Sequence, residues 1–387
     1  MSSTDTATRT GKNGCPFNFL IWVCLAPITA AIILYRIDPF DPAPLPVHEF
    51  TSKPISAPKK NPRMLHGSER LGSGILLGPE DLAYDPKSQV LYTGCGDGWI
   101  KRVKVTESVD DTVIEDVANT GGRPLGVALG LNNDIVVAGL FLVSEEGEVK
   151  LLTDEAEGLK FKLTDGVDVG EDGMIYFTDA TYKHNLSVHH FDMLEGRPHG
   201  RVLSYNPSTK ETKVLLQDLF FANGLALSPD QTFFVFCETI LRRCSKYNLR
   251  GHKKGSVEKF VENLPGFPDN IRYDGEGQFW IAMFTETTTF WDLAWRYPFI
   301  RKTLAIAIKY IPIPITEKNS GVMAVDMDGN PVAHYFDPKM SAITTGVKIG
   351  NYLYCGSIYH PYITRLDLSR FQAQESAQVN LLGASRF

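Results

Sequence analysis

The chain lacks the features of several large functional classes. Six cysteines among 387 residues are too few for a disulfide-built scaffold, and no pair of Cys or His residues has the spacing of a zinc site. Neither a G-x-S-x-G turn nor a Ser-His-Asp order is visible, which argues against a serine hydrolase. The net charge of −6, without a basic tract in the body of the chain, argues against nucleic acid as the main partner.

The residues that are present describe a folded protein with many turns. Hydrophobic residues make up 43% and charged residues 22%, which excludes disorder throughout the chain. The 33 glycines and 23 prolines indicate frequent turns, and the 11% of aromatic residues suits β-strands. Length alone predicts two or three domains, since a typical domain has about 150 residues.

The longest apolar segment lies near the N-terminus. Phe19–Tyr35 contains no charged residue, and its length reaches the lower end of the ~17–25 residues that cross a bilayer as a helix. We expect an uncleaved transmembrane signal-anchor helix over residues 17–37, with a short cytosolic tail at 1–16 because Arg9 and Lys12 precede the apolar run. A cleaved signal peptide and a buried core helix are the alternatives.

An anchor or a signal peptide would deliver the rest of the chain to a lumen. Residues 38–64 are Pro-rich and indicate an extended linker. In a lumen, Asn185 stands in a usable glycosylation sequon, Asn-Leu-Ser. Cys237 and Cys244 flank a short segment of a predicted hairpin and would lie opposite each other. A disulfide and two free thiols both remain open.

One pattern recurs from residue 78 onward: a short apolar alternation, a polar turn and a second apolar strand. The repeats are DPKSQVLYTG (85–94), LNNDIVVAG (131–139), GEDGMIYFTD (170–179), SPDQTFFVFCE (228–238), DGEGQFWIAM (274–283) and KIGNYLYCGS (348–357). Units of roughly 40–60 residues with about four strands each are typical of a β-propeller. We therefore predict an all-β fold, a single six-bladed β-propeller over residues 65–387, with a β-sandwich plus a further domain as the alternative.

An apolar insertion interrupts the fifth unit between residues 284 and 316. It is rich in aromatic residues, Leu and Ile, and parts of it could form an amphipathic helix. We expect it to lie over the mouth of the propeller as a lid, since it directly follows a strand of the fifth blade. Contact with a membrane and a merely structural extension are the alternatives.

The innermost strands of a propeller start near the central channel, so equivalent starting positions form a ring. Carboxylate, carboxamide and hydroxyl oxygens in one channel are the ligands that Ca²⁺ prefers. The alternative is that these residues only cap turns. We expect one calcium ion on the axis, held within a ring of Glu80, Pro124, Thr164, Asn223, Asp269 and Thr344, with Asp81, Asp165 and Asn270 beside it.

Several phrases resemble the strictosidine synthase-like family: GPEDLAYD, GRPLGVALG, FANGLALSPDQT, CETILRRCSKY and LPGFPDNIRYD. The resemblance covers about residues 65–370 and is nearest to the plant subgroup, which is similar to the animal adipocyte plasma membrane-associated proteins. It implies a single membrane span, a lumenal propeller, and a place in the endoplasmic reticulum, vacuole or plasma membrane.

The wider superfamily includes calcium-dependent lactonases and arylesterases, and the resemblance implies their ligand set. Glu80, Asn223 and Asp269 match that set, and Asn270 follows as in the family phrase. Thr164 departs from the Asn that these enzymes usually carry. Asp165 or a water would then have to compensate.

The resemblance also separates two chemistries. Strictosidine synthase needs a glutamate just before the inner strand of the last blade, and the aligned residue here is Thr344, which cannot serve as a general acid or base. Metal-assisted hydrolysis of a small apolar ester or lactone is therefore the favoured function, with His199 or His360 as the base. A non-catalytic scaffold with a structural calcium and a residual condensation activity are the alternatives, and no protein partner is indicated.

Overall fold

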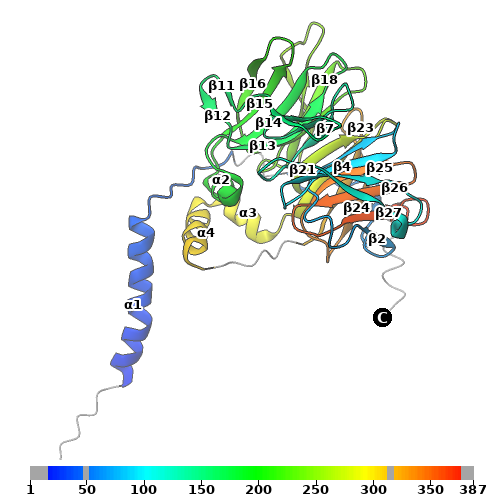
Figure 1. Cartoon of the computed structure of the whole chain (residues 1–387). Helices are drawn as coiled ribbons and strands as arrows, with labels where there is room; N and C mark the ends of the chain where they lie inside the picture. Colours follow the sequence, from blue (N-terminus) through cyan, green and yellow to red (C-terminus); the bar gives the residue numbers. More distant parts are fainter. Residues whose placement is uncertain (1–15, 47–51, 312–317, 376–387) are drawn as a thin grey trace, which may run out of the picture.

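The recurrent strand-and-turn pattern folds into six blades of antiparallel strands around a common axis (Figure 1). The structure is a computed structural model that describes residues 16–46, 52–311 and 318–375. The first strand of each blade contacts the first strands of its two neighbours, so these strands line the central channel. The prediction of a six-bladed β-propeller is confirmed.

Blades 1 to 3 follow one another along the chain, each beginning with its innermost strand. Blade 1 comprises β3 (Leu82–Asp85), β4 (Val90–Gly94), β5 (Trp99–Lys104) and β6 (Ile114–Asn119). Blade 2 comprises β7 (Val127–Leu129), β8 (Ile135–Val137), β9 (Phe141–Val143) and β10 (Val149–Leu151), and a hairpin of β11 (Glu155–Ala156) and β12 (Leu159–Lys160) follows it. Blade 3 comprises β13 (Leu163–Val169), β14 (Ile175–Thr181), β15 (Gly200–Asn206) and β16 (Glu211–Leu219).

Blades 4 to 6 continue this order, and the last two also recruit strands from the chain ends. Blade 4 comprises β17 (Ala222–Leu227), β18 (Phe233–Glu238), β19 (Arg243–Asn248) and β20 (Val257–Val261). Blade 5 comprises β21 (Gly266–Tyr273), β22 (Gln278–Glu286), β23 (Ser320–Asp326) and β24 (Pro331–Asp337), extended by β1 (Lys59–Asn61) and β28 (Gln374–Glu375). Blade 6 comprises β25 (Ile343–Ile349), β26 (Tyr352–Ser357), β27 (Ile363–Asp367) and β2 (Ser68–Leu71).

Strand β2 closes the ring. It comes from the start of the propeller sequence but forms the outer strand of blade 6, where Leu71 pairs with Ile363 of β27. Strand β1 lies within the segment predicted to be a linker, yet it pairs in parallel with β24 of blade 5. The chain before the first blade is therefore partly built into the propeller.

Both faces of the blades are buried, which explains why their strands are apolar at consecutive positions. In β22, Phe279 and Ile281 pack toward Val235 of blade 4. The alternate residues Trp280 and Ala282 pack on the other face, in a cluster shared with blade 6. Since successive side chains of a strand point to opposite faces, a strand between two blades has no polar face.

Two helical insertions cover the end of the propeller at which the inner strands start. Helix α2 (His189–Glu195), preceded by the short helix η3 (Leu186–Val188), connects β14 to β15, and α3 (Thr289–Arg296) and α4 (Pro298–Tyr310) connect β22 to β23. Trp291 and Trp295 of α3 pack edge-on against Phe267, two residues before Asp269. For the described helices, the expectation that this insertion lies over the mouth is confirmed.

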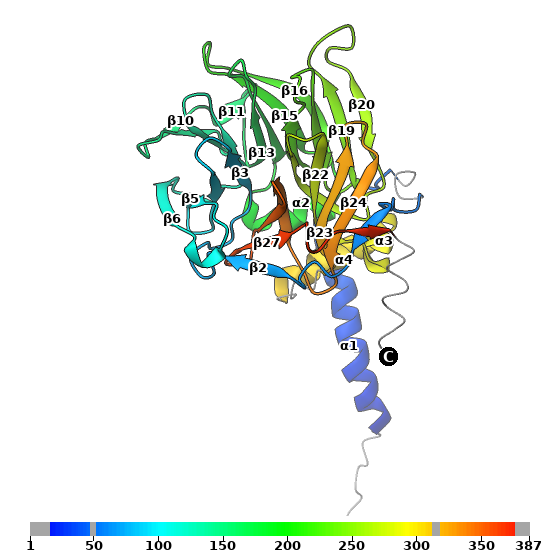
Figure 2. The ribbon, with the colours of Figure 1, turned by 90° about the vertical axis from the view of Figure 1, so that its right-hand side faces the viewer.

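Helix α1 (Pro16–Ile37) leaves the propeller on the side of α3 and α4 (Figures 1 and 2). Its bounds agree with the predicted segment 17–37, and Val23, Ile28 and Ile32 are exposed. Among the described residues, no helix combines the length and hydropathy that a membrane crossing needs. The predicted tail lies almost entirely outside the described residues.

Candidate metal centre

Three carboxylates meet where the inner strands of three blades begin. Glu80 precedes β3, Asp165 lies in β13 and Asp269 lies in β21. One oxygen from each lies within 4.8 Å of the others, and all three side chains are buried. Ligands at 2.3–2.6 Å from a Ca²⁺ ion are at most about 5 Å apart, so this spacing fits a single ion.

Four oxygen atoms of the ring residues are buried without a hydrogen-bond partner in the described part of the chain. They are Glu80 Oε2, Asp165 Oδ1, Asn223 Oδ1 and Asp269 Oδ1. A buried acceptor that makes no hydrogen bond costs about 1–3 kcal/mol, and more if it is charged. Four acceptors from four different blades therefore form a donor set that suits a hard cation.

Irregular strand pairing aims these side chains into the channel. The register between β13 and β14 shifts around Thr164 and Val167, that between β17 and β18 shifts between Ala222 and Leu225, and β21 shifts relative to β22 between Pro268 and Ile271. Each shift contains a ring residue. A bulge of this kind redirects a side chain that regular pairing would hold in the blade.

Glycines beside the ligands let the inner strands approach one another. A Cβ atom at Gly166, which follows Asp165, would lie 2.7 Å from the carbonyl oxygen of Asn223. A Cβ atom at Gly224, which follows Asn223, would lie 2.6 Å from the carbonyl oxygen of Asp269. Only glycine leaves room for such a close backbone approach, so the T-D-G and N-G phrases set the size of the ring.

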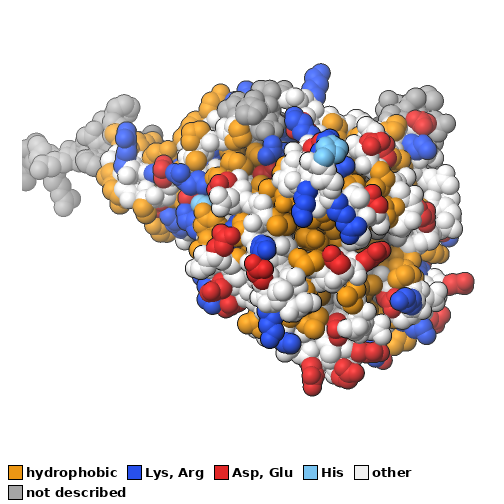
Figure 3. All heavy atoms as spheres, turned by 90° about the horizontal axis from the view of Figure 1, so that it is seen from above, with side chains coloured by type: hydrophobic (Ala, Val, Ile, Leu, Met, Phe, Trp, Pro, Cys, Tyr) orange, Lys and Arg blue, Asp and Glu red, His pale blue; other side chains and the backbone are white. Residues whose placement is uncertain are grey.

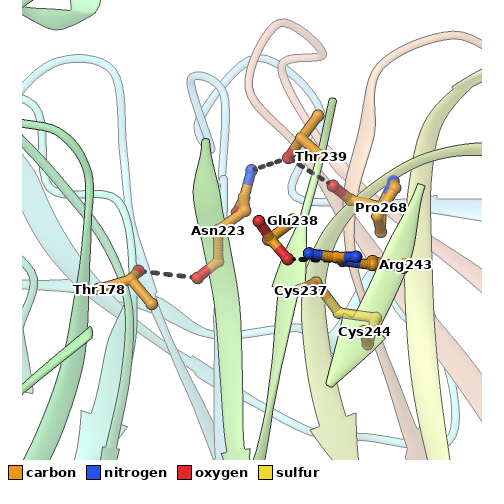
Figure 4. The surroundings of a disulfide bond; sticks show 8 residues. All are labelled: Thr178, Asn223, Cys237, Glu238, Thr239, Arg243, Cys244 and Pro268. Atoms are coloured by element: carbon orange, nitrogen blue, oxygen red, sulfur yellow. Dashed lines mark hydrogen bonds and ion pairs between the residues drawn. A yellow bond between two sulfur atoms is a disulfide. The ribbon is translucent and has the colours of Figure 1, made fainter. Parts of the chain in front are cut away.

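Neighbouring hydrogen bonds orient the ligand oxygens. Asn270 Nδ2 donates to Glu80 Oε1 at 2.8 Å and leaves Oε2 toward the centre. Asn223 Nδ2 donates to Thr239 Oγ1 at 3.3 Å, and that hydroxyl donates to the carbonyl oxygen of Pro268 at 2.8 Å (Figure 4). The amide nitrogen of Asn223 is thereby engaged by Thr239, and its oxygen is left without a hydrogen-bond partner among the described residues.

Burial and mutual repulsion make the cluster reluctant to ionise. Desolvation, followed by the charges of Asp165 and Asp269, raises the pKa of Glu80 well above its ordinary value. Desolvation also raises the pKa of Asp269 well above its ordinary value, and it raises the pKa of Asp165 to about 7. The carboxylates need either protons or a cation between them.

The remaining ring residues take other places. Thr164 is buried and pairs in the strand ladder with Asp179, while the neighbouring Asp165 supplies the third carboxylate. Thr344 donates through Oγ1 to the backbone oxygen of Glu80 at 2.6 Å. Asn270 faces Glu80 with its amide nitrogen and so acts on the site through that carboxylate.

Asp81 belongs to a buried ion pair that the sequence did not reveal. Arg272 Nε donates to Asp81 Oδ1 at 3.2 Å, and the same guanidinium donates to the carbonyl oxygens of Val127 and Val167. This contact ties blades 1, 2, 3 and 5 together across the channel. Arg272 also lines a depression of about 570 Å³ at the opposite mouth, among the last residues of the inner strands.

The two predicted catalytic histidines lie in different places. His199 Nδ1 contacts Asp192 Oδ1 of α2 at 2.8 Å, and Thr181 Oγ1 donates to the same oxygen at 2.7 Å. His360 lies in the loop after β26, where its carbonyl oxygen accepts from Gly78 N, two residues before Glu80. Burial, and then the charge of Arg70, lowers the pKa of His360.

Three further histidines in the insertion between β14 and β15, His184, His189 and His190, are half-buried. The His189 ring lies 6.3 Å from that of Phe221, two residues before Asn223. Burial lowers the pKa of His189 and of His190. They are not fully exposed because the insertion folds back over the start of blade 4.

The structure places the cysteine pair and the glycosylation sequon that were expected for a lumenal protein. Cys237 and Cys244 face each other in the ladder of β18 and β19 and form a disulfide (Figure 4). Asn185 of the sequon is exposed, and its side chain accepts a hydrogen bond from Ser187 Oγ at 2.7 Å.

Acidic and basic side chains are interspersed on the face seen in Figure 3.

Solved structures with a similar fold are small propellers. A gluconolactonase from Xanthomonas campestris matches with a TM-score of 0.54 at 17% identity, covering 86% of this chain and 99% of that one. A calcium-binding regucalcin from Agrobacterium tumefaciens matches with a TM-score of 0.55 at 16% identity, covering 81% and 95%. At these identities the likeness shows the fold.

Sequence comparison places the chain in a family. Residues 60–103 match the family described as strictosidine synthase-like, N-terminal, and residues 165–252 match strictosidine synthase. Protein STRICTOSIDINE SYNTHASE-LIKE 6 of Arabidopsis thaliana is 54% identical over 92% of this chain and 97% of its own length. The adipocyte plasma membrane-associated protein of Gallus gallus is 33% identical over 88% of this chain and 87% of its own length. The chain therefore belongs to the strictosidine synthase-like family.

Proposed function

We propose that this protein is a calcium-dependent hydrolase of small apolar esters or lactones. The observation that carries the proposal is the convergence of four unpaired buried oxygens, three of them from carboxylates, at one end of the channel. The fold is shared with a gluconolactonase and with a calcium-binding regucalcin, which supports this chemistry.

The chain supplies the ligands and their orientation. Glu80, Asp165, Asn223 and Asp269 would hold the ion, with Asn270 fixing the carboxylate of Glu80. Bound there, Ca²⁺ supplies Lewis-acid polarisation of an ester carbonyl and stabilises the negative charge that develops on its oxygen.

The base is His199, supported by Asp192. The carboxylate at 2.8 Å from Nδ1 holds the proton on that nitrogen and leaves Nε2 as the acceptor for a proton from water. Asp192 is fully buried and also accepts from Thr181, so the imidazole is held in one orientation. His360 is the second candidate for this role, since its loop adjoins that of Glu80.

A condensation of the strictosidine synthase type is not part of the proposal. It requires a carboxylic acid where this chain has Thr344, whose hydroxyl is engaged by the backbone oxygen of Glu80. A propeller that keeps calcium only for stability is the second candidate, and the buried position of the carboxylates is compatible with it.

We further propose that helix α1 anchors the protein in a membrane of the endomembrane system with the propeller in the lumen. The exposed apolar side chains of α1 support this, as does the name of the animal relatives, adipocyte plasma membrane-associated protein. A disulfide and an exposed glycosylation sequon suit an oxidising lumen.

Phenyl acetate hydrolysis by the full-length protein tests the enzymatic proposal. We expect turnover with Ca²⁺, none after EDTA treatment, and recovery when Ca²⁺ is restored. Calcium binding without any turnover would instead support the scaffold. Asp269→Asn should abolish turnover, and Glu276→Gln, an exposed side chain outside the ring, is the matched control.

A further inference from the structure

Helices α3 and α4 carry a group of exposed, large apolar side chains. These side chains are between 44% and 66% exposed, and we call them the α3–α4 apolar surface: Phe290, Leu293, Tyr297, Phe299, Tyr310 and Ile311. Single exposed apolar residues are ordinary on protein surfaces. A set gathered on two adjoining helices is typical of a contact site.

On α3 the exposed side chains form one stripe and the opposite face is packed, whereas on α4 the buried Ile306 lies on the same helix face as the exposed Phe299 and Tyr310. Phe290, Leu293 and Tyr297 follow the i, i+3, i+7 spacing of one helix face, and Trp295 on the other face is buried in the core. Phe299 and Tyr310 are about three turns apart along α4. The exposed side chains of the two helices meet where the rings of Tyr297 and Phe299 lie 6.0 Å apart.

The C-terminal end of helix α1 and the residue that follows it contact helix α4. Lys309 Nζ lies 2.7 Å from Asp38 Oδ2, just after α1, and Lys302 Nζ donates to the carbonyl oxygen of Asp38 at 3.0 Å. The ammonium group of Lys302 also lies 5.0 Å from the centre of the Tyr35 ring. Figures 1 and 2 both place α3 and α4 on the side of the propeller from which α1 leaves.

We propose that the α3–α4 apolar surface lies in the interfacial layer of the membrane in which α1 is anchored. The inference rests on that proposed anchor. A helix 22 residues long spans ~33 Å at 1.5 Å per residue, close to the ~30 Å of a hydrocarbon core. The contacts of Asp38 therefore hold α4 at the level where α1 leaves the bilayer.

The composition of the surface favours lipid as its occupant. Tyrosines at 297 and 310 and the exposed Arg296 suit the boundary between headgroups and acyl chains. The exposed apolar side chains of α1 lie along the helix that ends directly before the Asp38 contacts. Because α3 packs on Phe267 near Asp269, docking would bring the mouth beside the bilayer and favour esters that partition into lipid.

A fluorescent label tests the inference in the full-length protein reconstituted into phosphatidylcholine liposomes. Phe299→Cys would carry the label in a Cys15→Ser, Cys24→Ser background, since Cys95 and Cys355 are buried. Leu131→Cys, exposed in the turn between β7 and β8, is the matched control. We expect doxyl-labelled lipid to quench the label at 299 several-fold more than the label at 131, and a label at Tyr310→Cys should behave like that at 299.

Equal quenching at positions 299 and 131 in protein that floats with the liposomes after carbonate washing would overturn the inference alone. Failure to float would overturn the anchor and the inference together. The label at 299 could instead be shielded from water without being quenched by lipid, to a degree that rises with protein concentration. That result would identify a second copy of the chain as the occupant of the surface and would also overturn the inference. Hydrolysis of phenyl acetate is measured separately and does not depend on any of these outcomes.

Discussion

At the scale of single residues, the candidate site depends on which of two adjacent side chains points into the channel. Counting along the inner strands selects Thr164, but the register shift after it turns Asp165 to the centre instead. Thr164 remains in the strand ladder beside Asp179. Asp165 thereby supplies the third carboxylate of the cluster.

Asp165→Asn and Thr164→Ala therefore form a matched pair. The first variant loses one negative ligand, so we expect Ca²⁺ affinity to fall at least tenfold, or about 1.4 kcal/mol. The second should leave affinity within about threefold, since its hydroxyl is not among the converging oxygens. Isothermal titration of Ca²⁺ into both variants measures the two affinities. A larger loss of affinity in Thr164→Ala than in Asp165→Asn would show that Thr164 is the ligand.

The raised pKa values of the cluster predict that calcium binding depends on pH. Protons and Ca²⁺ compete for the same carboxylates, and burial raises the pKa of Asp165 to about 7. Affinity should therefore fall as the pH is lowered from 8 to 6, and binding at pH 7 should release protons. Titrations in buffers of different ionisation enthalpy measure that release; a heat independent of the buffer would argue against it.

His334 predicts a separate loss of stability in acid. Burial lowers the pKa of His334 to about 3 from an ordinary value of 6.5, and its Nε2 atom is buried beside the stacked ring of Phe336. The unfolded chain binds the proton first, so stability is present above pH 6.5 and is lost progressively toward pH 3, at most about 1.4 kcal/mol per unit. His334→Leu should move the acid-unfolding midpoint to lower pH, whereas exposed His252→Leu should not.

At the scale of strands, the close packing of the inner strands determines the size of the candidate metal centre. Gly224 lies against the backbone of Asp269 and Asn270, where a side chain would collide with main-chain atoms. Main-chain atoms cannot rotate away as a side chain can. The spacing between the ligands of blades 4 and 5 is thereby tied to one glycine.

Gly224→Ala should widen the ring. We expect a loss of about 1–3 kcal/mol in the free energy of unfolding together with weaker Ca²⁺ binding, because the neighbouring strand must move. Gly122→Ala is the control, since a Cβ atom there meets nothing within 4 Å. Chemical denaturation of both variants with and without Ca²⁺ measures the effect. Equal stabilities would show that the inner strands adapt freely.

The elements predictable from sequence were those with a local signal. Consecutive apolar residues between Gly and Asp turns identify strands such as β22, and counting back from such strands locates Glu80 and Asp269. Strand β2 was not predictable as part of blade 6, because its partner lies almost 300 residues away. Arg272 was missed for the same reason, since its partner Asp81 lies 191 residues away. Asp192 was missed because its contact with His199, only seven residues away, follows no strand or helix periodicity.

At the scale of the whole molecule, six blades bring residues from distant segments to one end of a channel. The ion pair of Asp81 and Arg272 crosses the channel, and the depression of about 570 Å³ lies at the far mouth. The helical insertions cover the end that holds the carboxylates. One mouth of the propeller therefore holds the cluster of carboxylates and is covered by apolar helices. The other mouth has no converging carboxylates among the described residues.

The central claim is that the ring of buried oxygens binds one calcium ion. The most direct test is isothermal titration of Ca²⁺ into EDTA-treated full-length protein. We predict one ion per chain, bound with release of protons and with a higher melting temperature, because an ion that binds the native state stabilises it by mass action. No saturable binding at millimolar Ca²⁺, or binding unchanged in Asp269→Asn, would contradict the claim.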